Sequence, residues 1–290
     1  MAEEAWGRWG PDDERGALNL IGRDEVLRAV ALVRTGETLS LAQPISGRMM
    51  VPPHRPRATH FMARDGGDYA AGSRRPGGFG FADDGLVLPL HLGTHIDGLC
   101  HAWCGSMLYN GVPETAVRST GASRLGVDSL PPIVTRGVLL DFVALRGAPL
   151  PDGESIGREL LVQACERTGT TIGKGDAVLL RTGWYEAHTA GGKPDFNTEP
   201  GLDVEAALLL AEADVAVVGA DNYAVEAMPF PDGTVFPVHQ RLIRDYGIPL
   251  LEGLVLKPLA ERGAATFLFM AAALPIVGGT GSPLTPVAVL

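Results

Sequence analysis

The sequence predicts one domain of mixed α/β (α+β) class, built around a mostly buried β-sheet. Short apolar runs alternate with helical patterns through the second half of the chain, as in folds whose sheet is covered by helices. The runs are apolar throughout, which is typical of strands buried on both faces. The 290 residues, of which 46% are hydrophobic, contain no repeat or linker, so a single domain over 1–290 is expected.

The individual elements follow from these patterns. The apolar runs predict strands at Gly137–Phe142, Asp176–Thr182, Val215–Ala220, Pro249–Glu252 and Ala265–Ala272. The helical patterns cover Asp24–Thr35, Arg158–Thr168, Val204–Ala213 and Pro237–Tyr246. A glycine follows three of these helices and can end each in a left-handed conformation, at Gly36, Gly169 and Gly247.

Two stretches of the first third have no clear periodicity. Residues 1–21 are polar and rich in turn formers, which predicts an ordered N-terminal arm or loop. Residues Pro44 to Asp84 carry many Pro, Gly and Arg residues, and such a length without a pattern indicates a functional loop region rather than packed elements.

Composition excludes several classes of protein. The net charge of −10 repels phosphate backbones, so nucleic acid is not expected as a partner. No apolar stretch reaches the length of a membrane span, and the acidic start does not resemble a signal peptide. Three cysteines do not make a disulfide framework, so a reducing cytoplasm is the expected location.

The densest cluster of chemistry-bearing residues runs from His91 to His101. Three of the seven histidines lie in these eleven residues, with Asp97 among them. An apolar, extended segment precedes them and predicts that the run enters as a strand, in which His91, Gly93, His95 and Asp97 share one face. Gly93 then leaves room for an ion between the two imidazoles.

Two imidazoles and a carboxylate form a donor set that suits Zn²⁺, Mn²⁺ or Fe²⁺. Three protein ligands leave coordination positions open, as in catalytic rather than structural sites, and a bound water can then ionise near neutral pH. The alternative is a buried strand whose histidines bond backbone carbonyls. His101 follows Gly98 and need not face the ion, so it fits a proton-transfer role; an extra ligand or a packed core histidine is the alternative.

Other polar residues have weaker signals. His239 falls in the first turn of a predicted helix, where a solvated residue is common. Glu252 ends an apolar strand, where an unpaired carboxylate is costly to bury unless a metal or a basic partner compensates its charge. Asp221 and Asn222 follow a strand and either face a ligand or begin a turn; Glu226 shares this ambiguity. Gly278–Pro283 lacks the features of a phosphate loop and fits a tight turn that supports the site.

The role of the remaining candidates stays open. His54 and His60 lie in the Pro- and Arg-rich segment, where surface and pocket-lining positions are both open. Trp103, Phe61 and Trp184 are candidates for the wall of a pocket that holds a flat ring.

The chain resembles the cyclase family, which includes bacterial kynurenine formamidases and manganese-dependent isatin hydrolase. The shared pattern His-x-Gly-Thr-His-x-Asp-x-x-x-His runs from His91 to His101. The resemblance continues in Gly219-Ala-Asp-Asn222, Leu251-Glu-Gly-Leu254 and Gly278–Pro283, and the arm resembles a longer-chain branch. After Asp97, Gly-Leu stands where the small formamidases have a small residue and proline, a difference in the pocket wall.

This resemblance implies a mixed sheet of swivelling β/β/α type, a homodimer or homotetramer, and metal-dependent hydrolysis of an amide, lactam or related carbonyl compound at a C–N bond other than a peptide bond. It implies that His91, His95 and Asp97 bind Zn²⁺ or Mn²⁺ and that His101 is the acid–base residue. In relatives with two ions, the second uses a later histidine and a glutamate, here His239 and Glu252. The alternatives are a lyase or cyclase that stabilises an enolate, and a non-catalytic, metal-stabilised binding protein.

Overall fold

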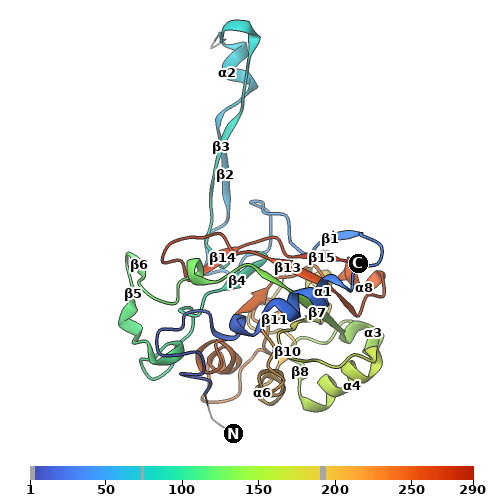
Figure 1. The fold of residues 1–290 in the computed structure, drawn as a ribbon. Coiled ribbons are helices and arrows are strands. Elements are labelled where there is room, and N and C mark those ends of the chain that lie inside the picture. The colour runs from blue at the N-terminus through green and yellow to red at the C-terminus, as the bar shows by residue number, and fades with distance from the viewer. Residues whose placement is uncertain (1–3, 73–74, 190–193) are drawn as a thin grey trace.

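The computed structural model describes residues 4–72, 75–189 and 194–290, and its central feature is a nine-stranded sheet (Figure 1). Residues 1–3 of the predicted arm and 73–74 of the predicted loop region lie outside the described residues. The order of the strands is β1-β15-β13-β7-β9-β11-β12-β4-β14. The sheet strands are β1 (Thr38–Ser40), β4 (His95–Asp97), β7 (Ile133–Asp141), β9 (Ala177–Arg181), β11 (Val217–Ala220), β12 (Leu250–Glu252), β13 (Thr266–Ala271), β14 (Gly281–Pro283) and β15 (Val287–Val289).

The sheet is mixed, and it curls into a half-barrel. Its centre, β7-β9-β11-β12, is parallel, and the strands on both sides of this centre pair antiparallel. The fold is therefore a mixed α/β single domain, as the sequence predicts. The swivelling β/β/α arrangement stays a prediction.

Helices and short ribbons complete the fold. The helices are α1 (Arg23–Val30), α2 (Gly66–Ala70), α3 (Phe142–Arg146), α4 (Arg158–Thr168), α5 (Trp184–Thr189), α6 (Val204–Glu212), α7 (Pro237–His239) and α8 (Lys257–Glu261). Three two-stranded ribbons pair β2 (Thr59–Arg64) with β3 (Asp83–Val87), β5 (Val117–Arg118) with β6 (Gly121–Ala122), and β8 (Ser155–Ile156) with β10 (Gly201–Leu202). No helix in the described part of the chain is long and apolar enough to cross a membrane.

Both faces of the parallel centre are buried. On β9, Val178 and Leu180 join the core that includes α4 and α6, whereas Ala177 and Leu179 join a second core on the opposite face. Successive side chains of a strand point to opposite faces, so a strand covered on both sides must be apolar at every position. This explains why four of the predicted strands correspond to β7, β9, β11 and β12; the fifth corresponds to β13, which lies beside this centre.

The segment predicted as a loop region contains a long hairpin, so that prediction is wrong in part. Strands β2 and β3 pair antiparallel and project from the body as an arm, with α2 near its tip (Figure 1). We call residues 59–87 the hairpin arm. Its strands are exposed on both faces, and Phe61 and Val87 are 50% and 65% exposed. Because no core imposes alternation on these strands, periodicity does not reveal them.

The predicted helix ends also differ in two places. The helix expected over Asp24–Thr35 ends at Val30, where Leu32 and Val33 bond carbonyls three residues back, as in a tighter 3₁₀ turn. The pattern Pro237–Tyr246 divides into α7 and a π-helical segment, Gln240–Asp245.

From residue 4 onward, the N-terminal segment contacts the body of the domain. The Trp6 indole donates to the Arg244 carbonyl at 2.8 Å, Arg8 forms an ion pair with Asp214, and Ala17 donates its amide to the Gly247 carbonyl at 2.8 Å.

Candidate metal centre

Strand β4 organises the site because its two neighbours in the sheet bring other chain segments to it. In the antiparallel pairing with β12, Glu252 lies directly opposite His95. In the pairing with β14, Gly281 lies opposite Asp97. Directly opposed residues in an antiparallel pair project from the same face of the sheet. The register therefore places the carboxylate of Glu252 beside the imidazole of His95, 157 positions away in the sequence.

His91 reaches the site by a different route from the one predicted. Only His95–Asp97 form a strand, and His91 precedes it in a bent segment where Gly93 has a φ of +65°. The shared face of a strand therefore does not explain the position of His91. The bend nevertheless brings Nδ1 of His91 to 2.8 Å from Oδ1 of Asp97, while Nε2 lies 3.0 Å from the Thr280 hydroxyl.

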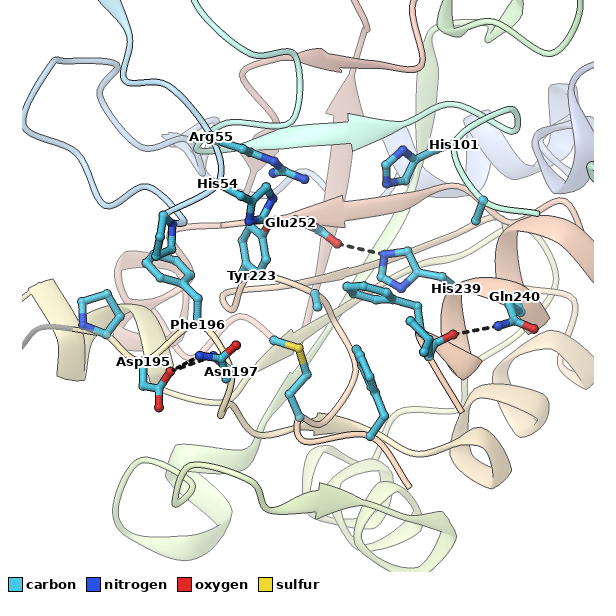
Figure 2. A pocket seen from close by; sticks show the side chains of 18 of the residues that line it. His54, Arg55, His101, Asp195, Phe196, Asn197, Tyr223, His239, Gln240 and Glu252 are labelled. Carbon is cyan, nitrogen blue, oxygen red and sulfur yellow. Dashed lines mark hydrogen bonds and ion pairs between the residues drawn. The ribbon is translucent and has the colours of Figure 1, made fainter. Parts of the chain in front are cut away.

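His239 and Glu252 form the second part of the cluster. Nε2 of His239 lies 3.3 Å from Oε1 of Glu252 (dashed in Figure 2) and 3.8 Å from Oδ2 of Asp97. Nε2 of His95 lies 3.1 Å from the other oxygen of Glu252. The five residues predicted as ligands are thus brought together from three separate parts of the chain.

The orientation of two of these imidazoles is fixed from outside the cluster. Nδ1 of His95 donates to the Gly93 carbonyl at 2.9 Å, which leaves Nε2 facing the cluster. Nδ1 of His239 donates to Glu226 at 2.5 Å, and the same carboxylate accepts the backbone amides of Val238 and His239. A metal-binding histidine commonly has such a partner on its other nitrogen.

His101 lies at the wall of the neighbouring cavity. A turn closed by the bond from its amide to the Gly98 carbonyl carries it back over the site, where its ring stacks on His91 with centroids 4.0 Å apart. Burial lowers the pKa of His101 to about 4, and the nearby imidazoles of His91 and His239 act in the same direction, against the charge of Asp97. This imidazole is therefore unprotonated near neutral pH and able to accept a proton.

The cluster fits a divalent cation. Asp97 is fully buried, and His95, His239 and Glu252 are almost so. Nε2 of His95 and Oδ2 of Asp97 are buried without a hydrogen bond to any described residue, an arrangement that costs free energy unless another group satisfies them. The donors form two groups with ligand atoms within 4.8 Å of one another, His91–Asp97–His101 and Asp97–His239–Glu252.

The electrostatics of the two carboxylates also favour a cation between them. Burial opposes the ionisation of Asp97, but the imidazoles of His101 and His91 outweigh it and hold the pKa below the usual range. Burial and the charge of Asp97 likewise oppose ionisation of Glu252, but the close imidazoles of His239 and His95 lower its pKa. Two ionised carboxylates in one buried site provide the negative charge that a metal ion compensates.

A cavity of about 820 Å³ opens beside the cluster (Figure 2). His101, His239 and Glu252 face it from the side of the cluster. Much of the remaining wall is aromatic and apolar, as in typical small-molecule sites. These lining residues are Trp103, Phe196, Tyr223, Met228, Phe230, Val235 and Phe236, and the polar residues His54, Arg55, Asp195, Asn197 and Gln240 complete the described part of the wall with Pro53, Ala102, Pro194 and Ala224.

Several residues left open by the sequence have structural positions. Asp221 is fully buried and accepts the amides of Thr182 and Gly183; burial raises its pKa to about 7, although these donors oppose the shift. Asn222 donates to the Pro200 carbonyl at 2.6 Å and accepts the Val225 amide at 2.9 Å. Both therefore hold turns.

The remaining candidates divide between the cavity and the arm. His54 lines the cavity, whereas His60 pairs with Asp84 at 2.6 Å on the hairpin arm. Of the three aromatic candidates, Trp103 lines the large cavity. Phe61 is exposed on the arm, and Trp184 is buried and lines a smaller hollow together with His91 and His95. The expectation for Phe61 is therefore wrong.

Three functional contacts were missed or left ambiguous by sequence reasoning. Glu226 orients His239, Thr280 contacts His91, and Arg55 enters the cavity wall. The predicted turn Gly278–Pro283 does support the site, since it carries Thr280 and Gly281 against His91. A carboxylate in an otherwise apolar stretch was the available signal for Glu226, as it was for Glu252.

Comparisons with known proteins identify the family of the chain. The family model described as "Putative cyclase" matches residues 39–227. A crystal structure of a novel cyclase is 37% identical, with 99% of both chains covered and a TM-score of 0.92. Among curated proteins, no relative matches the chain.

More distant structures share the fold. Isatin hydrolase A from Ralstonia solanacearum is 22% identical, with 87% of this chain and 91% of that chain covered and a TM-score of 0.65. A potential metal-dependent hydrolase with cyclase activity is 19% identical, with 87% and 98% covered and a TM-score of 0.57. The family match over most of the chain and the 37% identity over its whole length lead to one conclusion: this chain belongs to the cyclase family.

Proposed function

We propose that this protein is a metal-dependent hydrolase that cleaves an amide, a lactam or a related carbonyl compound at a C–N bond. The observation that carries the proposal is the buried pair of unsatisfied donor atoms, Nε2 of His95 and Oδ2 of Asp97, beside a cavity of about 820 Å³. Relatives named isatin hydrolase and metal-dependent hydrolase support it.

The proposed ligands are His91, His95 and Asp97, with His239 and Glu252 completing the same site or forming a second one that shares Asp97. A bound Zn²⁺ or Mn²⁺ supplies polarisation of the substrate carbonyl and lowers the pKa of water. Because the surrounding side chains are buried and oriented, they keep this chemistry away from bulk solvent.

His101 is the proposed acid–base residue. It faces the cavity and its ring lies beside His91. Its unprotonated nitrogen accepts the proton of the attacking water and returns it to the leaving nitrogen. We expect His101→Ala to lower kcat by about 10²- to 10⁴-fold while the protein retains its metal. If the metal is lost instead, His101 is a ligand, as the grouping His91–Asp97–His101 allows.

The first experiment is elemental analysis of the purified protein, followed by a panel of amides, lactams and lactones assayed with that metal restored. His95→Ala is expected to lose stoichiometric metal, and undiminished metal content contradicts the ligand assignment. Hydrolysis in ¹⁸O-labelled water must place the label in the product acid. Turnover without label favours the cyclase or lyase chemistry, and tight binding without any product favours a binding protein.

We further propose that the protein forms homodimers or homotetramers in the cytoplasm. The hairpin arm supports assembly, because Phe61, Met62 and Phe79 are 50%, 45% and 62% exposed on it, and an isolated two-stranded ribbon is marginally stable in water. Light scattering of the purified protein tests this proposal, and a monomer at micromolar concentration contradicts it.

A further inference from the structure

Arg55 is a cation in the wall of the large cavity and has no carboxylate partner among the described residues. It follows a tight turn in which its own amide bonds the Pro52 carbonyl at 3.0 Å. Its Nη1 donates to the backbone carbonyl of His91, and its guanidinium carbon lies 5.2 Å from the centre of the Tyr223 ring. Among the described residues, its other nitrogens have no hydrogen bond or ion pair.

These two contacts fix the orientation of the guanidinium. In Figure 2 it points into the cavity, toward the side where His101 lies. Stacking on Tyr223 restrains the plane, and the bond to the His91 carbonyl occupies Nη1 only. Because a guanidinium carries five N–H donors in a rigid fork, Arg55 still has donors for a second, planar acceptor.

What distinguishes Arg55 is its half-buried position in the cavity wall. Arginines on the body such as Arg136 and Arg181 form ion pairs with Asp176 and Asp141. Arg55 is half-buried and is the single Arg or Lys among the described lining residues. A partly desolvated cation whose donors face a binding cavity is suited to an anionic group of the ligand.

The charge of the cavity limits the kind of anion. Asp195 and Glu252 also line the wall, and a single guanidinium among carboxylates favours a monoanion over the doubly charged phosphate. The planar geometry of a guanidinium matches a carboxylate through two parallel hydrogen bonds.

On the basis of the proposed function, we infer that the substrate carries a carboxylate that binds Arg55, with an apolar or aromatic body between this anchor and the bond that is cleaved. Arg55 is then a specificity-determining residue in a cavity wall that also contains the apolar residues Phe230 and Phe236. It selects acidic amides over neutral ones of the same shape.

The test is a thermodynamic cycle measured by calorimetry on the zinc-loaded protein. The probes are 3-phenylpropionate and its neutral isostere, 3-phenylpropionamide, bound to the wild type and to Arg55→Met. Removing Arg55 is expected to reduce the preference for the carboxylate by about 10- to 100-fold, the range of a charge-assisted bidentate contact. Any contribution of the metal to carboxylate binding is common to both proteins and cancels in the cycle.

Arg57→Met is the matched control. Arg57 lies two positions along the same segment and also donates to backbone carbonyls, those of Gly47 and Met49, but it is exposed and does not line the cavity. It is expected to leave the preference unchanged. Arg55→Lys keeps the charge without the fork and is expected to recover only part of the preference.

The inference is overturned if Arg55→Met weakens both probes equally, which assigns Arg55 a structural role, or if the preference for the carboxylate is unchanged. The cycle uses equilibrium binding, so its result does not depend on whether any amide is cleaved. Failure of the hydrolase proposal is seen separately, as an absence of turnover with metal restored.

Discussion

The substitution Gly281→Ala tests the geometry of the site without changing any proposed ligand. Gly281 lies opposite Asp97 in the pairing of β14 with β4. A Cβ built on it lies 2.5 Å from Cε1 of His91 and 2.9 Å from both ring nitrogens. Non-bonded carbon atoms normally rest at about 3.5 Å or more, so the ring must move by about 1 Å.

That movement cannot leave the contacts of His91 intact. Both nitrogens are held, by Asp97 at 2.8 Å and by Thr280 at 3.0 Å, and His101 stacks on the ring. Metal–ligand distances tolerate deviations of about 0.2 Å, and a misplacement of about 1 Å costs about 100-fold in rate. We therefore expect Gly281→Ala to lower the affinity for zinc by at least about 10-fold and kcat/KM by about 100-fold.

The assay is zinc competition against a chromophoric chelator, with circular dichroism to establish that the variant is folded. Gly66→Ala is the control, since Gly66 lies on the hairpin arm and a Cβ there meets nothing within 4 Å. A folded Gly281→Ala protein with the zinc affinity and turnover of the wild type would refute the role assigned to His91.

Three further predictions follow from other parts of the structure. In Glu226→Gln, the carboxylate that accepts from the His239 ring and from two backbone amides becomes an amide, which can accept through only one of its two terminal atoms. We expect a 10- to 100-fold loss of metal affinity in the same competition assay. Unchanged affinity contradicts the positioning role of Glu226. Burial raises the pKa of Cys100 to about 12, so roughly one thiol in ten thousand is ionised at pH 8. A disulfide reagent should therefore modify exposed Cys104 at once and Cys100 only after unfolding or at far higher pH. Fast reaction of Cys100 in the native protein would contradict this prediction. Leu180 is fully buried on β9, so Leu180→Ala is expected to lower the free energy of unfolding by about 2–5 kcal/mol, as measured by urea denaturation.

How much of the fold the sequence predicts depends on what covers each strand. The central strands were predictable because two cores require apolar residues at successive positions, as in residues 177–180 of β9. The edge strands β1 and β14, and β15 beside β1, have three residues each, too few for a period to appear. The strands of the hairpin arm were not predicted for a different reason: a strand exposed on both faces does not require alternation of apolar and polar residues.

The candidate site was predictable where its residues are close in sequence and not where register brings them together. The composition of the run His91 to His101 indicates a metal site by itself. The proximity of Glu252 to His95 depends on the antiparallel pairing of β12 with β4, and a shift of that pairing by one residue moves the carboxylate to the other face. The resemblance to the family implied only that Glu252 binds a second ion, and the cost of burying a carboxylate indicated only that Glu252 has a metal or basic partner.

Gly93 and Thr94, which lie between His91 and His95, have structural roles that correct the sequence interpretation. Gly93 was expected to leave room for an ion within a strand; instead its φ of +65° bends the chain, and a Cβ there lies 2.5 Å from the terminal methyl of Met49. Thr94 is buried, donates its hydroxyl to the Gly253 carbonyl at 2.7 Å and accepts the Gln43 amide at 2.8 Å.

These contacts tie the bend to the residue after Glu252. The carbonyl of Gly253 also accepts from the Gln43 side chain at 2.8 Å, and Glu252 itself faces His95. The motif therefore encodes more than a set of ligands: its glycine turns the first histidine back over the strand, and its threonine holds that turn against the strand that supplies the glutamate. Because the threonine hydroxyl bonds both segments, a change there should displace His91 and Glu252 together, whereas a change at Gly281 displaces His91 alone.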